Sequence, residues 1–406
     1  MGRWPALDLA ADPAGWARAL GISREAVDLY LGSDVIDLHV DSFIWTRLIG
    51  YDLTRRHGPG LFGARFFSQA DLPRLRTARV TGAVWVVTTN PWSTAAERSD
   101  ALRRNLGRLR DLLSSSPDEA ELVRNVSEYQ AAARAGRHAA FLGIQGGNAL
   151  ERSTSVLDAF PTGLVVLVTL VHLTSSALGA TSSPLGLGPD EGLTRRGHEL
   201  VEWLDSQRIF VDLAHLSPRG FWDAVAAHDP SRPLLVSHTG VVGAHRHWRN
   251  VSDAQLRAVA ESGGTVGIMY DTGFLGDRPW GGSAERIVDH LAHVMRTVGD
   301  DFASLGSDWD GAIVTPRELR TCLELPRLVE LMLRRGFRTE SVRKILGRNF
   351  LRALGELRGH ESSRSNSDSQ SSGSPSSSES ASSASYPSSS RLSRGSRRLP
   401  RGPSST

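Results

Sequence analysis

The chain has 406 residues, of which 40% are hydrophobic and 22% charged, a composition typical of a globular protein with a sizeable core. Its net charge of +3 is too small to indicate a nucleic-acid partner. Cys322 is the only cysteine in the sequence, which excludes an intrachain disulfide and a zinc site built from cysteines.

The N-terminal sequence has no continuous apolar stretch of the kind found in a secretory signal. The longest apolar run, GLVVLVTLVHL from Gly163, has the length of a β-strand and falls short of the roughly 18 apolar residues of a membrane span. We therefore expect a cytoplasmic protein without a membrane span.

The main part of the chain alternates between strand and helix patterns. Residues 1–33 are expected to form a helical extension, and eight apolar runs rich in Val, Ile and Leu follow, separated by helical patterns. Strands buried on both faces and joined by helices indicate a parallel sheet. Eight such units predict a (β/α)8 barrel of the TIM type over residues 34–359, with a doubly wound open sheet as the alternative. The expected strands cover residues 35–41, 82–89, 139–145, 163–172, 209–217, 233–239, 264–270 and 302–310.

Three long helices are expected over residues 97–115, 197–207 and 283–299, and a closing helix over residues 339–354. After that helix the composition changes, because 22 of the last 46 residues are serine. A segment with so few apolar residues cannot offset its conformational entropy by burial, so residues 360–406 are predicted to be a disordered tail.

Polar residues that can bind a metal or move a proton end five of the expected strands. His39 and Asp41 are two residues apart, so their side chains share one face of a strand and can converge on one ion. A closed barrel gathers the carboxyl ends of its strands in one mouth, where imidazoles and carboxylates suit Zn²⁺ or a similar divalent ion. The other residues of this set are His172, His215, His238, Asp308 and Asp310, and Gln145 ends the third strand.

Each of these residues taken alone has an ordinary structural explanation. A single histidine is more often a hydrogen-bonded core or surface residue than a ligand, and Asp310, which precedes Gly311, is better explained as a turn former. It is the combination at several strand ends that favours a metal site. The remaining histidines, at positions 57, 138, 198, 228, 245, 247, 290, 293 and 360, are expected to be structural or solvated.

Several motifs, in this order, resemble the zinc-dependent membrane (renal) dipeptidase family: DLHVD, LVTLVHLTSS, GLTRRGHELV, VDLAHLS, LVSHTG, RNVSD, GGTVGI and LGSDWDG. The resemblance covers about residues 34–356. It implies a (β/α)8 barrel with zinc ions in its mouth and hydrolysis of dipeptides, often with tolerance for D-residues at the C-terminal position. It also implies a possible homodimer.

By this resemblance, His39 and Asp41 would hold a first zinc ion, and His215 and His238 a second. The family has a glutamate that bridges the two metals where this chain has Gln145. An amide has one carbonyl oxygen and an NH₂ group that cannot bind a cation, so it cannot bridge as a carboxylate does. The only lysine of the chain lies in the closing helix, so no carbamylated lysine can replace the bridge.

The resemblance also assigns the residues that handle the substrate. His172 would hold and polarise the substrate, Arg249 would clamp its terminal carboxylate, and Asp308 would carry the proton from the attacking water to the leaving amine. The chain is therefore predicted to be a dipeptidase with one or two zinc ions and small peptides as substrates. Three interpretations of Gln145 stay open: a weak or absent second metal, a protein that binds peptide-like ligands without turnover, and a glutamine that ligates two metals with help from hydroxide or substrate.

Overall fold

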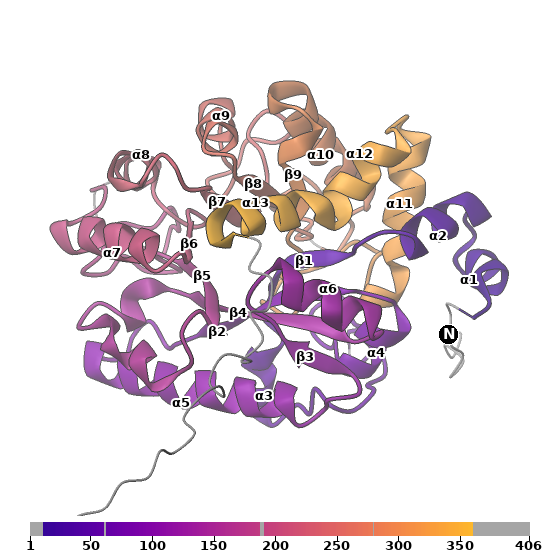
Figure 1. Ribbon diagram of the computed structural model, residues 1–406. Coiled ribbons are helices and arrows are strands. Elements are labelled where there is room, and N and C mark those ends of the chain that lie inside the picture. The colour runs from indigo at the N-terminus through magenta and orange to yellow at the C-terminus, as the bar shows by residue number, and fades with distance from the viewer. Residues whose placement is uncertain (1–10, 61, 187–190, 279, 360–406) are drawn as a thin grey trace, which may run out of the picture. The chain divides into compact units, whose positions relative to one another are not determined.

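The computed structural model describes residues 11–60, 62–186, 191–278 and 280–359. Nine parallel strands form one sheet, and eight of them follow a single path in which each pairs with the next (Figure 1). The last strand reaches the first through a parallel bridge between Val40 and Trp309 and through hydrogen bonds from Asp41 N to Trp309 O and from Asp308 N to His39 O. The predicted (β/α)8 barrel is confirmed, and the open sheet is excluded. The strands are β1 (Ile36–Val40), β2 (Gly82–Thr88), β4 (His138–Gln145), β5 (Val165–Thr169), β6 (Phe210–Asp212), β7 (Leu235–Thr239), β8 (Thr265–Ile268) and β9 (Ala303–Leu305).

A short extra strand, β3 (Ala120–Leu122), pairs in parallel with the start of β4 and lies off the barrel path. The sequence did not predict it, because three residues with a central glutamate show neither an apolar run nor an alternation. Its pairing extends the sheet beside β4.

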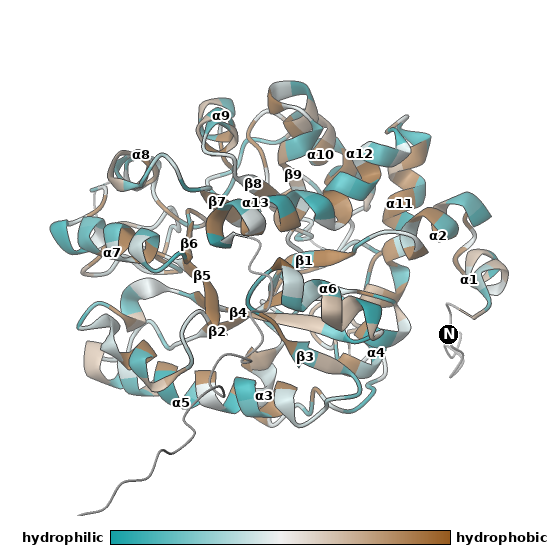
Figure 2. Cartoon of the chain, viewed as in Figure 1, coloured by the Kyte–Doolittle hydropathy of each residue, from teal (hydrophilic) through white to brown (hydrophobic). Residues whose placement is uncertain are grey.

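Helices surround the strands, with their apolar sides turned inward (Figure 2). Helix α5 (Ala95–Ser114) begins at a capping box in which the side chains of Thr94 and Glu97 each accept from the other's backbone N–H. Helix α9 (Asp253–Glu261) begins in the same way at Ser252 and Gln255. The helices after β1 are α3 (Phe43–Ile49), α4 (Leu72–Thr77), α5 (Ala95–Ser114), α6 (Val126–Arg134), α7 (Arg195–Ser206), α8 (Pro218–Ala227), α9 (Asp253–Glu261), α10 (Glu285–Val298) and α11 (Leu325–Arg334). Among the described residues, no helix combines the length and the apolar character needed to cross a bilayer.

Two helices precede the barrel: α1 (Pro13–Leu20) and α2 (Arg24–Leu31), which lie beside α11 in Figure 1. Trp16 is buried and donates from Nε1 to Leu323 O, and the buried Tyr30 donates its hydroxyl proton to Ala78 O. These contacts dock the pair on the outside of the barrel, at the turn before α11 and at the end of α4.

The closing segment consists of α12 (Thr339–Arg343), a π-helical turn (Lys344–Arg348) and α13 (Asn349–Arg358), where the sequence predicted one continuous helix. Gly347 lies in the π turn, and a Cβ there would meet Asp34 O at 2.7 Å, so the turn lets the helix approach the backbone just before β1. The predicted disordered tail, residues 360–406, lies outside the described residues.

Helix α13 closes the end of the barrel at which the strands begin. Phe350 packs against Phe141 of β4 and Phe210 of β6, with ring centroids 5.3 and 6.0 Å away. The Arg358 guanidinium donates to four backbone carbonyls near the starts of α6, β5 and β6. They belong to Arg124, Gly163, Val165 and Arg208. The opposite end, where the strands finish, is left for the site.

Candidate functional site

The structure gathers the predicted site residues at the carboxyl ends of the strands. His39, Gln145 and His238 lie in β1, β4 and β7, and the others follow the ends of strands. Seven of the eight, all except His172, are buried although they are polar or charged, and Arg249 is described below with His172. The exposed fractions of the other six are 0% for His39, 2% for Asp41, 3% for Gln145, 8% for His215, 0% for His238 and 7% for Asp308.

One tight group consists of His39, His238 and Asp308, whose candidate ligand atoms all lie within 4.8 Å of one another. His39 Nε2 is 3.8 Å from Asp308 Oδ1, and the two imidazole rings have centroids 3.7 Å apart. The group takes His39 from the predicted first pair of ligands and His238 from the predicted second pair. The two predicted metal positions therefore adjoin each other.

A second group surrounds the side-chain amide of Gln145. The Nε2 atoms of His215 and His238 are 2.9 Å apart, and Gln145 Nε2 is 3.4 Å from both. Zinc bonds of about 2.0–2.1 Å in tetrahedral geometry place the ligand atoms about 3.3 Å apart, close to the edges of this triangle. A half-turn of the amide exchanges its nitrogen and oxygen and would bring Oε1 into the triangle.

The donor atoms of the site fit a divalent cation. In the described part of the chain, His39 Nε2, Asp41 Oδ1 and Gln145 Oε1 are buried and have no hydrogen-bond partner. Buried polar atoms without partners cost free energy, and a cation held by these three residues would offset that cost. Imidazole nitrogens and carboxylate oxygens are ligands that suit zinc.

Burial also keeps the imidazoles neutral. It lowers the pKa of His39, His215 and His238 well below the usual value, and neighbouring charged groups add to this effect. Each ring therefore has a free lone pair at neutral pH. Burial raises the pKa of Asp41 to about 7, and burial together with Asp41 raises the pKa of Asp308. A bound cation would oppose both of these shifts.

His172 and Arg249, the two predicted substrate residues, reach the same mouth. The half-buried His172 has its ring edge-on to His215, with centroids 4.8 Å apart, and burial lowers its pKa to about 3. Arg249 is 3% exposed and donates from Nη2 to His238 O at 2.6 Å. Its Nε has no partner among the described residues. Burial lowers the pKa of Arg249 to about 10, and Asp308 opposes that shift.

The backbone departs from regular strand geometry at several site residues. His215 and Asp308 have positive φ values of 68° and 62°, a region that residues other than glycine seldom occupy. The strand register shifts between Asp37 and Val40 in β1, and between Val236 and Thr239 in β7, next to His39 and His238. Such irregularities redirect side chains and are frequent beside active sites.

Three buried carboxylates support the site without belonging to its donor set. Asp37 Oδ1 accepts from the backbone N–H groups of His39 and Ser307. Asp212 accepts from Ser237, which also contacts two imidazoles. The sequence analysis did not single out Asp37, Asp212 or Ser237. The signal was present in FVDLAH, where an acid stands inside a fully buried strand.

Asp310 is the third of these carboxylates, and it holds loops together. It accepts from Gln69 N at 3.0 Å, from Ala70 N at 3.2 Å and from the Ser42 hydroxyl. The carboxylate therefore ties the segment after β1 to the segment after β9, which agrees with the expected structural role.

Several of the other histidines are held by hydrogen bonds away from the mouth. His138 accepts from Trp85 Nε1 and contacts Val80 O, His228 pairs with Asp205, and His290 accepts from Val241 N. His360 lies outside the described residues.

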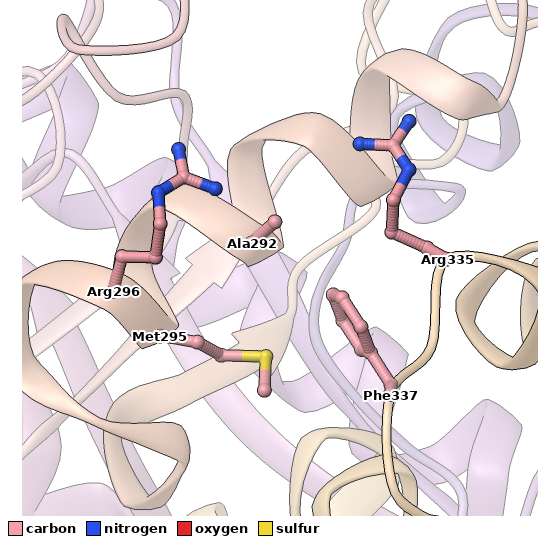
Figure 3. Close-up of a pocket in the computed structure, with 5 residues that line it drawn as sticks. All are labelled: Ala292, Met295, Arg296, Arg335 and Phe337. Carbon is pink, nitrogen blue, oxygen red and sulfur yellow. The ribbon is translucent and has the colours of Figure 1, made fainter.

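A separate hollow of about 400 Å³ lies between α10 and the loop after α11, and it contains none of the predicted site residues. Figure 3 shows Arg296 and Arg335 on either side of an apolar floor that includes Met295 and Phe337. Arg335 is paired with Asp289 at 2.6 Å.

Comparison with known proteins agrees with the geometry. Residues 23–368 match the family model described as membrane dipeptidase, peptidase family M19. The chain is 29% identical over 296 residues to Dipeptidase tcpJ of Claviceps purpurea, covering 71% of this chain and 69% of that protein. It is 35% identical over 166 residues to an uncharacterized protein of the pqqA 5′ region of Klebsiella pneumoniae, covering 40% of this chain and 60% of that protein.

Two solved structures have the same fold. A metallopeptidase of Rhodobacter sphaeroides, liganded with a phosphinate mimic of the dipeptide L-Ala-D-Ala, has a TM-score of 0.70 and 22% identity, over 80% of this chain and 99% of that one. The probable dipeptidase PvdM of Pseudomonas aeruginosa has a TM-score of 0.72 and 18% identity, over 84% and 98%. The family match spans most of the chain, and the chain therefore belongs to the membrane dipeptidase family, peptidase family M19.

Proposed function

We propose that this protein is a metal-dependent dipeptidase that uses zinc. The observation that carries the proposal is the packing of neutral imidazoles and buried carboxylates, with unpaired donor atoms, in the mouth of the barrel. Family membership and the similarity to a fungal dipeptidase support it. In this proposal His39 and Asp41 hold a first metal ion, and His215 and His238 hold a second.

The bound metal supplies Lewis acidity, which lowers the pKa of water and polarises the scissile carbonyl. Asp308 accepts the proton of the attacking water at a carboxylate oxygen and passes it to the leaving amine. Asp308 Oδ1 lies 3.8 Å from His39 Nε2, so the carboxylate borders the proposed first metal position, where the attacking water would lie. His172 borders the same space and contacts the carbonyl side of the substrate.

Arg249 recognises the terminal carboxylate of the dipeptide. Its guanidinium is buried and already bonded to the backbone of the ligand His238, and its Nε remains available to an anion. A planar guanidinium suits a carboxylate because it donates two parallel hydrogen bonds. The phosphinate mimic of L-Ala-D-Ala in the bacterial relative supports dipeptides as substrates here, with tolerance of a D-residue at the C-terminal position.

Gln145 weakens the second metal position in this proposal. Gln145 lies beside His215 and His238, which offer only neutral nitrogens as ligands. Its amide oxygen is also neutral, so none of these three side chains offsets the positive charge of a cation at this position. The alternative function is a catalytically impaired member of the family that binds peptide-like ligands, and the neutral amide is the observation that favours it.

Hydrolysis by the full chain tests the two functions. The protein is stripped with a chelator, restored with Zn²⁺ and given a panel of free dipeptides that includes C-terminal D-residues. If the protein is a dipeptidase, turnover should require zinc and should fall at least a hundredfold in Asp308→Asn. Binding of the dipeptides without turnover, in the zinc-restored protein, would support the alternative and refute the dipeptidase.

A further inference from the structure

A hydroxyl group and a carboxylate lie directly behind two of the candidate metal ligands. Ser237 is fully buried next to His238 in β7, and Asp212, also fully buried, ends the neighbouring strand β6. Ser237 Oγ is 2.6 Å from Asp212 Oδ2, 2.8 Å from His238 Nδ1 and 3.3 Å from His39 Nδ1. One side chain therefore contacts both imidazoles on the side away from the mouth.

The proton of the Ser237 hydroxyl is directed by Asp212. Asp212 Oδ1 faces the backbone N–H groups of Ser237 and Ala214 at 2.8 and 3.2 Å, and Oδ2 accepts from Thr169 Oγ1 at 2.5 Å. With Ser237 Oγ as the fourth donor, each carboxylate oxygen accepts two hydrogen bonds, which fills its usual capacity. Asp212 is therefore an acceptor only, and the Ser237 proton points toward it.

A hydroxyl that donates its single proton retains two acceptor lone pairs. Ser237 has two imidazole Nδ1 atoms within reach, so both lone pairs can be used only if each Nδ1 carries a hydrogen. We propose that Asp212, acting through Ser237, sets the Nδ1–H tautomer of both His39 and His238. It thereby leaves the Nε2 lone pairs of both rings free to bind metal. Asp212 and Ser237 are positioning residues in this arrangement, which rests on the metal site of the proposed function.

The backbone of Ser237 is closely packed by its neighbours. A Cβ at Gly267 would meet Ser237 O at 2.1 Å, and a Cβ at Gly306 would meet it at 1.8 Å. Only glycine allows this close approach of β8, and of the residue after β9, to β7. The register shift between Val236 and Thr239 accompanies it. His215 lies outside the arrangement, since its Nδ1 has no partner among the described residues.

The substitution Asp212→Asn reverses the direction of the hydrogen bonds. The two backbone N–H groups at Oδ1 require an acceptor there, so the asparagine must place its oxygen at that position and its NH₂ at the Oδ2 position. The NH₂ then donates to Ser237 Oγ, and the hydroxyl proton turns toward an imidazole Nδ1. The ring that accepts it becomes the Nε2–H tautomer, which cannot bind metal through Nε2.

The experiment measures the tautomers of His39 and His238 and the affinity for zinc, and neither measurement depends on dipeptide turnover. In the metal-free wild-type protein, labelled with ¹⁵N-histidine, both His39 and His238 should give Nδ1–H spectra. Asp212→Asn should convert at least one of them to Nε2–H, and Asp212→Asn and Ser237→Ala should each lower zinc affinity 10- to 100-fold in competition with a chelator.

Thr169→Val is the matched control, because Thr169 donates to the same oxygen of Asp212 and forms no hydrogen bond with an imidazole of the described residues. It should keep both tautomers and change zinc affinity less than threefold. An Nε2–H form of either ring in the wild type would overturn the proposal. An equal loss of affinity in Thr169→Val and Ser237→Ala would also overturn it, since it would show that Asp212 only stabilises the fold.

Discussion

The Nε2 atoms of His215 and His238 lie 2.9 Å apart at the mouth of the barrel, so without a metal one neutral ring can donate its Nε2–H to the other. Burial lowers the pKa of both rings well below the usual value, so both stay neutral and each can offer a lone pair to a cation. Because the two nitrogens come from different strand ends and meet only in the folded chain, metal binding and folding should be coupled.

Metal removal should therefore destabilise the protein. At a free zinc concentration about 100-fold above the dissociation constant, binding stabilises the native state by about 2.7 kcal/mol. Thermal unfolding of the stripped protein, with and without added Zn²⁺, measures this. His238→Ala should lose most of the zinc-dependent rise in melting temperature, whereas His138→Gln should retain it. The same melting temperature for the wild type with and without zinc would contradict the coupling.

Arg249→Met should raise KM strongly for free dipeptides and much less for C-terminally amidated ones. A charge-assisted hydrogen bond contributes roughly 1.5–3 kcal/mol, or about ten- to a hundredfold in KM. Steady-state kinetics on both substrate types separates loss of the carboxylate contact from a general disturbance of the site through His238. Equal losses on both substrates would place the carboxylate contact elsewhere.

His138 should make stability depend on pH. Its ring accepts from Trp85 Nε1, which can only donate, and burial lowers its pKa to about 4 from a usual 6.5. The folded state therefore resists protonation that the unfolded chain accepts. The stabilisation is complete above pH 6.5 and is lost as the pH falls toward 4, by about 3 kcal/mol in all.

His138→Gln keeps a donor and an acceptor but cannot be protonated. Urea unfolding between pH 7 and pH 4.5 should show a shallower loss of stability in this variant than in the wild type. Parallel pH curves for the two proteins would assign the acid sensitivity to other groups.

Asp310→Ala should weaken the fold without removing metal. It leaves the buried N–H groups of Gln69 and Ala70 without their acceptor, at a cost of about 1–3 kcal/mol each. Asp308→Asn should do the reverse and lower zinc affinity with a smaller effect on unfolding. Denaturation and zinc analysis of both variants test whether Asp310 serves the fold and Asp308 serves the metal site. A loss of zinc in Asp310→Ala as large as in Asp308→Asn would refute this assignment.

The contrast between Asp308 and Asp310 also shows where prediction from the sequence ended. Two residues apart, they would share a face in a regular strand. Both have positive φ, however, so the chain has left strand geometry, and Asp308 faces His39 while Asp310 faces the loop after β1. The eight apolar runs predicted the barrel strands because a strand that is buried on both faces has a continuous run of apolar residues.

Contacts that depend on the register between neighbouring strands could not be predicted from the sequence. The approach of Ser237 to Asp212 needs the register of β7 against β6 and β8, which no local pattern specifies. The short strand β3 was missed because its three residues carry no periodicity, and the π turn at Lys344–Arg348 because it follows from packing on the segment before β1.

The number of zinc ions bound per chain, in the wild type and in Gln145→Glu, tests the account of the site most directly. With one neutral amide at the His215–His238 position, the wild type should hold clearly fewer than two zinc ions at modest free metal. An added anionic oxygen near a dication contributes several kcal/mol even at an effective dielectric of about 20, so Gln145→Glu should approach two ions and gain dipeptide turnover. Two tightly held zinc ions in the wild type, with no gain from the glutamate, would contradict the account.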